Sequence, residues 1–319
     1  MGDRTVTAYA CHTRVHGYDA VTVIQTTPTW DLTSNLSILT AGRNARFAIH
    51  HVRIRRHQAV THIQLETVHV SEPPFGPNIE GATFDTLTNH LILWGFRSKH
   101  FVVWNDTRQK ETMEVECGGS HRSWAYRHNN HGSDGGRFIW TKASTCYIYT
   151  QPEASHHVIE SGSHGREIKA MALFSAEETS EAHKPILIAT GAEDTIIRIF
   201  EYNMTDSTLS HKLECQTNMK DHTTGIQQLK WCPDGSYLFS AGGCEELYAW
   251  RVQWVPYFGV GVVCRAKCPL VTEDSDLRVM DFDVTVANDE TSKSSVILSV
   301  VYSDSSVRVS YYTPPEWQG

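Results

Sequence analysis

Short alternations of apolar and polar residues recur along the chain, each followed by a turn and a second alternation. The clearest starts at Ile226 and runs into Pro233-Asp-Gly, a combination typical of turns. A second strand is expected to end near Ser240, and a third to end at Trp250 after a tight turn. This order of elements predicts consecutive β-hairpins.

The same ten-residue step, from the second predicted strand to the third, occurs six times. The six hairpins cover residues 40–50, 94–104, 139–149, 190–200, 240–250 and 300–310. Their starts lie 54, 45, 51, 50 and 60 residues apart. Periods of about 40 to 50 residues are typical of propeller blades. We therefore predict an all-β propeller of six blades, in which each hairpin supplies the middle strands of a four-stranded blade.

The two ends of the chain are expected to complete this ring. After Tyr311-Tyr312 comes Thr-Pro-Pro, which leaves the last blade without an outer strand. Residues 5–11 alternate like a strand but have no blade of their own, so we expect them to pair with residues 306–312 and remove an exposed sheet edge. Residues 1–319 then form one domain, and a seventh blade would need residues 1–27 to form more than strands of neighbouring blades.

Residues 221–250 resemble a WD repeat, which implies a buried hydrogen-bonded set. In that family a His before the first strand, a Ser or Thr on the second, an Asp in the next turn and a Trp on the third satisfy one another's polar groups. His222, Ser240 and Trp250 match this pattern. Cys244 stands where the Asp is expected, so we expect the network to be incomplete.

The preceding repeat departs from the pattern at another position. It has His164 before its first strand, Thr190 on the second and Asp194 in the turn. Phe200 replaces the Trp. We expect His164, Thr190 and Asp194 to be structural.

Charge and composition limit the function classes. Hydrophobic residues make up 40% of the chain and charged residues 20%, which predicts a folded core. The net charge of −8 argues against a stand-alone nucleic-acid binder, so any RNA contact is expected to be local or shared with a partner. The apolar stretch 257–264 is too short to cross a membrane, and residues 1–6 do not resemble a signal peptide. We expect a cytoplasmic protein.

The chain offers little for catalysis, metal or cofactor chemistry. Its eight cysteines are scattered, and only Cys264 and Cys268 are close in sequence, so reduced thiols are expected. Neighbouring histidines on a strand, as in His50-His51 and His156-His157, point to opposite faces. His128-Asn-Asn-His131 is expected to be mostly solvated surface. With no phosphate loop, nucleophile elbow or metalloprotease helix, the sequence predicts a binding protein that is not an enzyme.

Two segments contain more charged and aromatic side chains than the structure of a blade requires. In the first, Gly118-Gly119 precedes four candidate partner-binding residues, His121, Arg122, Trp124 and Tyr126. Arg and Trp together suit a desolvated protein contact or a base stack. The alternative is that His121 is the network His of this blade and Trp124 packs in the core.

In the second segment, Arg166 and Glu167 are expected in a loop that leads into an innermost strand, at the propeller rim. They either form a mutual salt bridge or contact a partner. Together with Arg122 and Trp124 they are candidates for one continuous patch.

A third candidate is the basic run Arg53-Ile-Arg55-Arg56. Arg53 and Arg55 share a strand face and suit phosphate contacts, with Arg56 beside them. The alternative is a solvated outer strand.

Three motifs carry a closer likeness. Gly118-Gly-Ser-His-Arg-Ser-Trp124, His164-Gly-Arg-Glu-Ile168 and Ala189-Thr-Gly-Ala-Glu-Asp-Thr195 resemble the C-terminal propeller of the WD-repeat auxiliary subunit of the tRNA ribose methyltransferase. Members of that family are longer and have further propellers upstream, so this chain corresponds to the last part of one. The resemblance implies a subunit without its own catalysis or cofactor, which docks the methyltransferase and helps to place tRNA for wobble-position 2′-O-methylation. tRNA would be contacted indirectly or through a local basic patch. The alternative is a generic WD-repeat scaffold, such as a trafficking or ubiquitin-ligase adaptor.

Overall fold

The computed structural model describes most of the chain. The described residues are 14–28, 36–57, 60–129, 135–151, 164–175, 186–202, 213–270, 272, 277–288 and 294–313. They form twenty-two β-strands in six antiparallel sheets, and no helix occurs within these ranges. The search of this part of the chain accordingly finds no helix that could span a membrane. The predicted all-β class of WD-type blades is confirmed.

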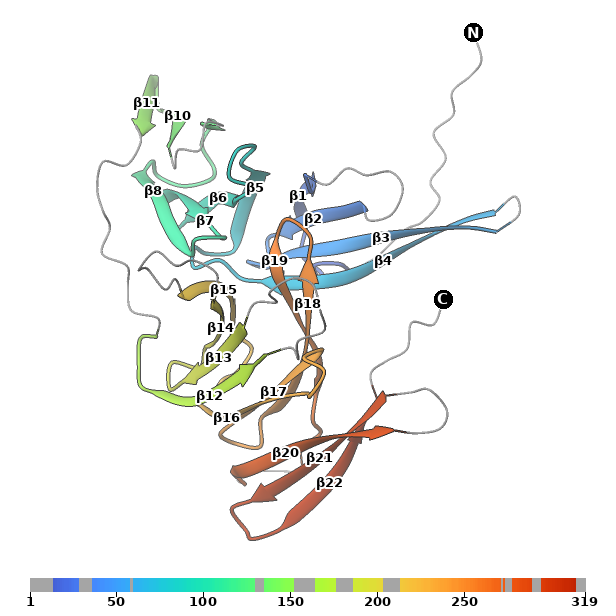
Figure 1. Cartoon of the computed structure of the whole chain (residues 1–319). Helices are drawn as coiled ribbons and strands as arrows, with labels where there is room; N and C mark the ends of the chain where they lie inside the picture. Colours follow the sequence, from blue (N-terminus) through green and yellow to red (C-terminus); the bar gives the residue numbers. More distant parts are fainter. Residues whose placement is uncertain are drawn as a thin grey trace, which may run out of the picture. The chain divides into compact units, whose positions relative to one another are not determined.

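The chain divides into two compact units, which are described separately. The first comprises Met1–Val158 and Val255–Phe258. It contains three sheets, with the strand orders β1-β2-β3-β4, β5-β6-β7-β8 and β11-β10-β9 (Figure 1). Their bounds are β1 Val21–Thr26, β2 Leu36–Gly42, β3 Phe47–His57, β4 Val60–Ser71, β5 Asn78–Phe84, β6 Leu91–Arg97, β7 His100–Asn105, β8 Lys110–Glu116, β9 Trp124–His128, β10 Gly136–Lys142 and β11 Thr145–Gln151.

The second unit comprises Ile159–Trp254 and Gly259–Gln318. Its three sheets have the strand orders β12-β13-β14-β15, β16-β17-β18-β19 and β20-β21-β22 (Figure 1). Their bounds are β12 Ile168–Phe174, β13 Ile186–Ala192, β14 Ile197–Tyr202, β15 Leu213–Met219, β16 Ile226–Trp231, β17 Tyr237–Gly242, β18 Leu247–Val255, β19 Gly259–Lys267, β20 Val279–Asn288, β21 Ser294–Tyr302 and β22 Val307–Tyr312.

All six predicted hairpins are present as paired strands. They are β2–β3, β6–β7, β10–β11, β13–β14, β17–β18 and β21–β22. In four sheets the hairpin occupies the middle, as predicted, whereas the other two sheets have three described strands. Residues 5–11 lie outside the described residues, so their pairing with 306–312, ring closure and a seventh blade stay predictions.

A β-bulge recurs at the start of the first strand in five of the six sheets. The pairing with the second strand changes register near the start of β1, β5, β12, β16 and β20, for example between Ile226 and Gln228. A bulge bends and twists a strand locally. Its repetition at one place shows that these sheets are copies of the same structural unit, although their sequences differ.

Each unit has an apolar core made by facing sheets. In the second unit, Trp250 and Leu238 belong to a buried cluster with residues of β12–β15, and Phe239 belongs to another with residues of β20–β22. Successive residues of the same strand, Leu238 and Phe239, therefore face opposite neighbours. This explains why every residue of β17 is buried. A strand buried on both faces is apolar throughout and gives a weak alternation signal.

Candidate functional site

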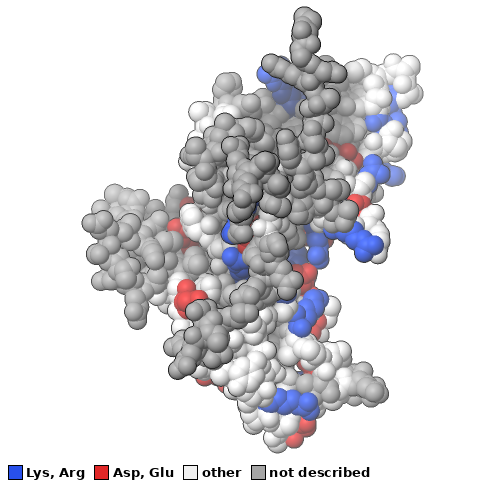
Figure 2. All heavy atoms as spheres, turned by 90° about the vertical axis from the view of Figure 1, so that its right-hand side faces the viewer, with Lys and Arg blue, Asp and Glu red and all other residues white. Residues whose placement is uncertain are grey.

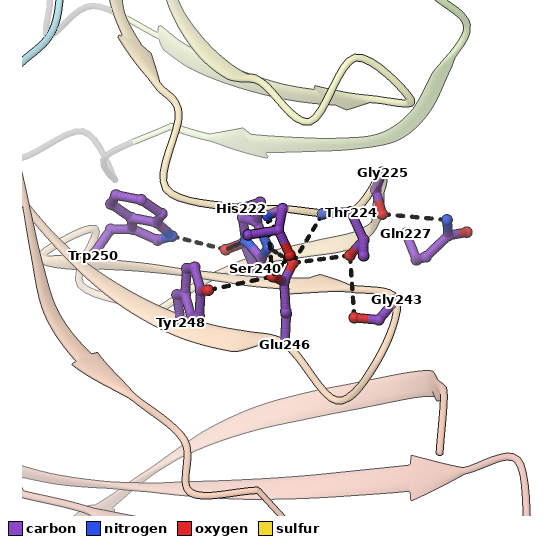
Figure 3. Close-up of polar contacts among 10 residues, drawn as sticks. His222, Thr224, Gly225, Gln227, Ser240, Gly243, Glu246, Tyr248 and Trp250 are labelled. Carbon is purple, nitrogen blue, oxygen red and sulfur yellow. Dashed lines mark hydrogen bonds and ion pairs between the residues drawn. The ribbon is translucent and has the colours of Figure 1, made fainter. Parts of the chain in front are cut away.

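The β16–β19 sheet contains the hydrogen-bonded set expected from the repeat (Figure 3). His222 Nε2 lies 2.6 Å from Ser240 Oγ, and Trp250 Nε1 donates to the same oxygen at 2.7 Å. On its other side, His222 Nδ1 lies 2.9 Å from Glu246 Oε2. An ionised carboxylate only accepts hydrogen bonds, so Nδ1 carries a proton, and in the neutral imidazole Nε2 then accepts from the Ser240 hydroxyl. The buried polar groups thus satisfy one another.

The expectation that this network is incomplete at Cys244 is wrong, because Glu246 supplies the missing carboxylate. Cys244 and Glu245 both have left-handed backbone, with φ of 55° and 60°. This turn directs the longer Glu246 side chain back to His222, and brings it to the 222–224 loop as well. Burial opposes ionisation of Glu246, but hydrogen bonds from His222, Thr223 and Thr224 outweigh it and lower the pKa of the carboxyl.

The β12–β15 sheet has a second set, with the consensus carboxylate. His164 Nε2 lies 2.8 Å from Thr190 Oγ1, and His164 Nδ1 lies 3.2 Å from both oxygens of Asp194. The backbone N–H of Gly165 donates to Asp194 at 2.9 Å. Phe200, in place of the Trp, is buried without a polar contact to Thr190.

Sequence reasoning missed a third set in the β1–β4 sheet. His16 Nε2 lies 2.9 Å from Thr40 Oγ1, and His16 Nδ1 lies 3.0 Å from Asn44 Oδ1. His50 Nε2 lies 2.8 Å from the same Thr40 hydroxyl. Asn44 and His50 stand four and ten residues after Thr40, the spacing that Asp194 and Phe200 have from Thr190. This spacing is the feature of the sequence from which the third set could have been predicted. His50 is thus a structural residue.

The Gly118-Gly119 turn folds Arg122 back onto the chain. Both glycines have positive φ, and a Cβ on Gly118 would lie 2.5 Å from Arg122 Nε. The Arg122 guanidinium therefore packs against bare backbone, and its buried Nε has no hydrogen-bond partner among the described residues. His121 is exposed and makes no described hydrogen bond, so it lacks the contacts of a network His.

Trp124 and Tyr126 face the interior of the first unit. The Trp124 ring packs against Phe96 and Phe101 at centroid distances of 5.2 and 5.8 Å. Tyr126 Oη lies 3.2 Å from His128 Nδ1, and burial raises the pKa of the Tyr126 phenol. This packing accounts for both aromatic residues without a partner.

The expectation that His128 is solvated is wrong. The His128 side chain is buried, and its Nε2 lies 3.7 Å from Asp85 Oδ2, in addition to the Tyr126 contact. His131 and His156-His157 lie outside the described residues. In the described part of the chain, no three His, Cys, Asp or Glu side chains gather as a metal site would require.

Arg166 and Glu167 lie in the loop before β12, but they do not pair with each other. Glu167 binds Lys169 at 2.6 Å, and Lys169 also contacts Glu193 at 3.3 Å. The mutual salt bridge considered from the sequence is therefore wrong, since Lys169 on the next strand takes the carboxylate. Arg166 is exposed and has no ion pair with any described carboxylate. Arg166 lies in the second unit, and Arg122 and Trp124 in the first.

The basic run on β3 is partly neutralised. Arg53 Nη2 lies 2.8 Å from Glu66 Oε2, a carboxylate whose side chain is 2% exposed. The backbone of Arg55 and Arg56 belongs to β3, but their side chains lie outside the described part. On the face drawn in Figure 2, the described Lys and Arg side chains are separated by neutral and acidic residues. The described surface there has no large uniformly basic area.

Comparison with known proteins gives one family match and several relatives. The family model described as "WD domain, G-beta repeat" matches residues 213–250. The mouse tRNA (34-2'-O)-methyltransferase regulator WDR6 is 25% identical over 204 residues, which is 52% of this chain and 17% of that protein. Its human counterpart is 33% identical over 84 residues, 24% of this chain and 7% of that protein.

The relatives extend to insects. The Drosophila melanogaster protein of the same name is 25% identical over 174 residues, 50% of this chain and 16% of that protein. Each match therefore spans less than a fifth of the relative's length. Among solved structures, Kluyveromyces lactis Hsv2 is 9% identical, with 94% of this chain and 76% of that chain covered. Its TM-score of 0.31 supports no conclusion about how the sheets are arranged.

The family model and the hydrogen-bonded set of the β16–β19 sheet thus fall on the same residues. The chain carries a WD repeat within an all-β fold, and over about half of its length it is similar to proteins named tRNA (34-2'-O)-methyltransferase regulator.

Proposed function

We propose that this chain is a non-catalytic subunit that docks a tRNA 2′-O-methyltransferase in the cytoplasm and helps to present tRNA for ribose methylation at the wobble nucleotide. The observation that carries the proposal is its similarity, over 204 residues, to a protein named as a regulator of that reaction. A regulator acts on an enzyme, so the methyl-donor site and the catalytic groups belong to the partner.

Arg166 is the residue best placed to contact the partner. It is exposed, it precedes β12 on a loop held by the Gly165–Asp194 hydrogen bond, and no described carboxylate neutralises it. A fixed loop lowers the backbone-ordering cost when its guanidinium binds a carboxylate or a phosphate. Arg122 is the second candidate, because it is only half-buried and its guanidinium forms no ion pair with a described carboxylate.

The other candidates have weaker roles in this proposal. Trp124 and Tyr126 are engaged in packing inside the first unit, and Glu167 is paired with Lys169. His121 stays a candidate contact because it is exposed. The net charge of −8 and the Arg53–Glu66 ion pair favour a protein-docking surface over a surface that binds RNA without a partner. tRNA contact through Arg55 and Arg56 stays part of the proposal.

Co-purification with the methyltransferase tests the proposal. The wild-type chain is expected to retain the catalytic subunit, and Arg122→Ala with Arg166→Ala to reduce complex formation at least about tenfold, the scale of hot-spot truncations. Arg308→Ala, which removes an exposed cation from β22, is the matched control. A wild-type chain that does not retain the enzyme would favour a generic scaffold. A folded double variant that binds normally would show that these arginines are ordinary surface.

A further inference from the structure

A hollow of about 430 Å³ lies in the second unit, and its lining includes Thr224, which contacts Glu246. Three segments form its walls: the 224–227 loop and strand start, the 243–244 turn, and residues 278–280 at the start of β20. The volume is within the range of sites that hold small ligands or a few side chains. The His222, Ser240 and Trp250 side chains of the hydrogen-bonded set do not line this hollow.

The walls are held in place before any ligand binds. Thr224 Oγ1 lies 2.8 Å from Glu246 Oε2 and 3.1 Å from the Gly243 carbonyl, which ties two walls together (Figure 3). Gln227 Nε2 donates to the Gly225 carbonyl at 3.3 Å. The third wall is fixed because the backbone N–H of Arg278 donates to Ser303 Oγ at 3.1 Å. A preformed site avoids much of the ordering cost of binding.

Among the described residues that line the hollow, one is charged. This residue, Arg278, is exposed and forms no ion pair with a described carboxylate. Glu246, behind the wall, has its oxygens occupied by His222, Thr223 and Thr224. A guanidinium in this setting is suited to a carboxylate, which it binds through two parallel N–H donors.

Apolar surface lies beside the cation. The Met280 side chain is 62% exposed, and Cys244 is an exposed residue of the facing turn. Thioether and thiol groups adapt to aliphatic side chains of different shapes. The hollow therefore combines one anion-binding group with an adaptable apolar wall.

We propose that this hollow binds a short segment of a partner protein in which an Asp or Glu lies next to an apolar side chain. The carboxylate pairs with Arg278 while the apolar side chain covers Met280 and Cys244. A nucleic acid is a poorer occupant, because it needs several cations along its backbone and the described lining offers one. The proposal does not require the partner to be a methyltransferase.

A peptide array on the full chain tests the chemistry. The probes are peptides with Gly-Ser flanks and a centre that pairs Asp or Glu with Leu, Ile, Phe or Met, each matched by its Asn or Gln counterpart. The acidic peptides are expected to bind at least about tenfold more tightly than the amides, and Arg278→Gln to remove that preference. Met280→Asp is expected to weaken binding by repelling the carboxylate, and Arg308→Gln is the control.

Alkylation locates the bound peptide. Cys244 and Cys146 are both exposed, but only Cys244 lines the hollow, so a bound acidic peptide is expected to slow the alkylation of Cys244 by N-ethylmaleimide and leave Cys146 unchanged. Equal binding of acidic and amide peptides, binding that survives Arg278→Gln, or an unprotected Cys244 would overturn the proposal. Protection of Cys244 by a single-stranded RNA oligonucleotide and not by peptides would also overturn it. None of these outcomes depends on whether the methyltransferase binds.

Discussion

The β16–β19 and β1–β4 sheets solve the same packing problem with different residues. Each places a histidine ring against a hydroxyl on the second strand. In the β16–β19 sheet the other ring nitrogen meets the carboxylate of Glu246, and in the β1–β4 sheet it meets the amide of Asn44. What is maintained is therefore a closed set of hydrogen bonds, and the identity of each group is secondary.

The two acceptors, Glu246 and Asn44, differ in the number of further groups that they bind besides the histidine. Glu246 accepts from His222 and from the backbone and hydroxyl groups of Thr223 and Thr224, so one carboxylate fixes a whole loop. Asn44 accepts from the backbone N–H of Arg46 at 3.2 Å besides its His16 contact. Hydrogen bonds to a charged group are about twice as strong as neutral ones. The β16–β19 sheet is expected to depend more on its acceptor.

The largest effect is expected for Glu246→Ala. It leaves His222 and the 223–224 loop without their acceptor, and we expect the free energy of unfolding of the β16–β19 sheet to fall by about 3 kcal/mol. Hydrogen exchange of the amides of β17 is the measurement. Asn44→Ala is the matched change in the β1–β4 sheet and is expected to cost about 1 kcal/mol. Equal costs would show that the charge of Glu246 is unimportant.

The second effect concerns the histidines themselves. His222→Ala leaves Ser240 with the Trp250 indole as its side-chain partner, and we expect a loss of about 2 kcal/mol. His16→Ala is expected to cost less, because His50 still contacts the Thr40 hydroxyl. Thermal unfolding of both variants compares them. A larger loss for His16→Ala would contradict the assignment of equivalent positions.

The third effect is a pH dependence that only one of the two acceptors has. Because the pKa of Glu246 is lowered on folding, its contribution to stability is present above its ordinary value of 4.5 and is lost as the pH falls below it. The wild-type chain is expected to lose more stability between about pH 5 and pH 3 than Glu246→Gln does. Urea unfolding at several pH values gives this difference, and parallel curves would contradict it.

The smallest effect has the opposite sign. Asn44→Asp gives the β1–β4 sheet a carboxylate at the position that Asp194 has in the β12–β15 sheet, and we expect a gain of about 0.5 kcal/mol at neutral pH. Hydrogen exchange of β2 amides at pH 7 measures it. Asn44→Leu, which cannot accept a hydrogen bond, is the control, and it should destabilise the same amides.

Local spacing was sufficient to predict the hairpins, and some of the polar sets, from the sequence. The ten-residue step predicted all six pairs of strands, because a hairpin depends on residues close in sequence. His164, Thr190 and Asp194 followed from the consensus, and the structure shows them hydrogen-bonded. The His16 set carried the same spacing in different residue types and was therefore missed.

Other features depend on conformation that the sequence does not reveal. Glu246 replaces the consensus Asp only because two successive residues of its turn are left-handed. Glu167, in the loop before β12, pairs with Lys169 on that strand and not with its sequence neighbour Arg166. Arg122 and Trp124 looked alike as contact residues, and packing against Phe96 and Phe101 separates them.

Ribose methylation at nucleotide 34 of tRNA tests the central claim most directly. It is to be assayed in cells that depend on this protein and express it as wild type, as Arg122→Ala with Arg166→Ala, or as Arg308→Ala. Abundance and folding of each variant are checked by limited proteolysis. We expect the double variant to lose most of the methylation and Arg308→Ala to retain it. Normal methylation with the folded double variant would contradict the roles proposed for Arg122 and Arg166 in docking. Normal methylation in cells without the protein would contradict the proposed function itself.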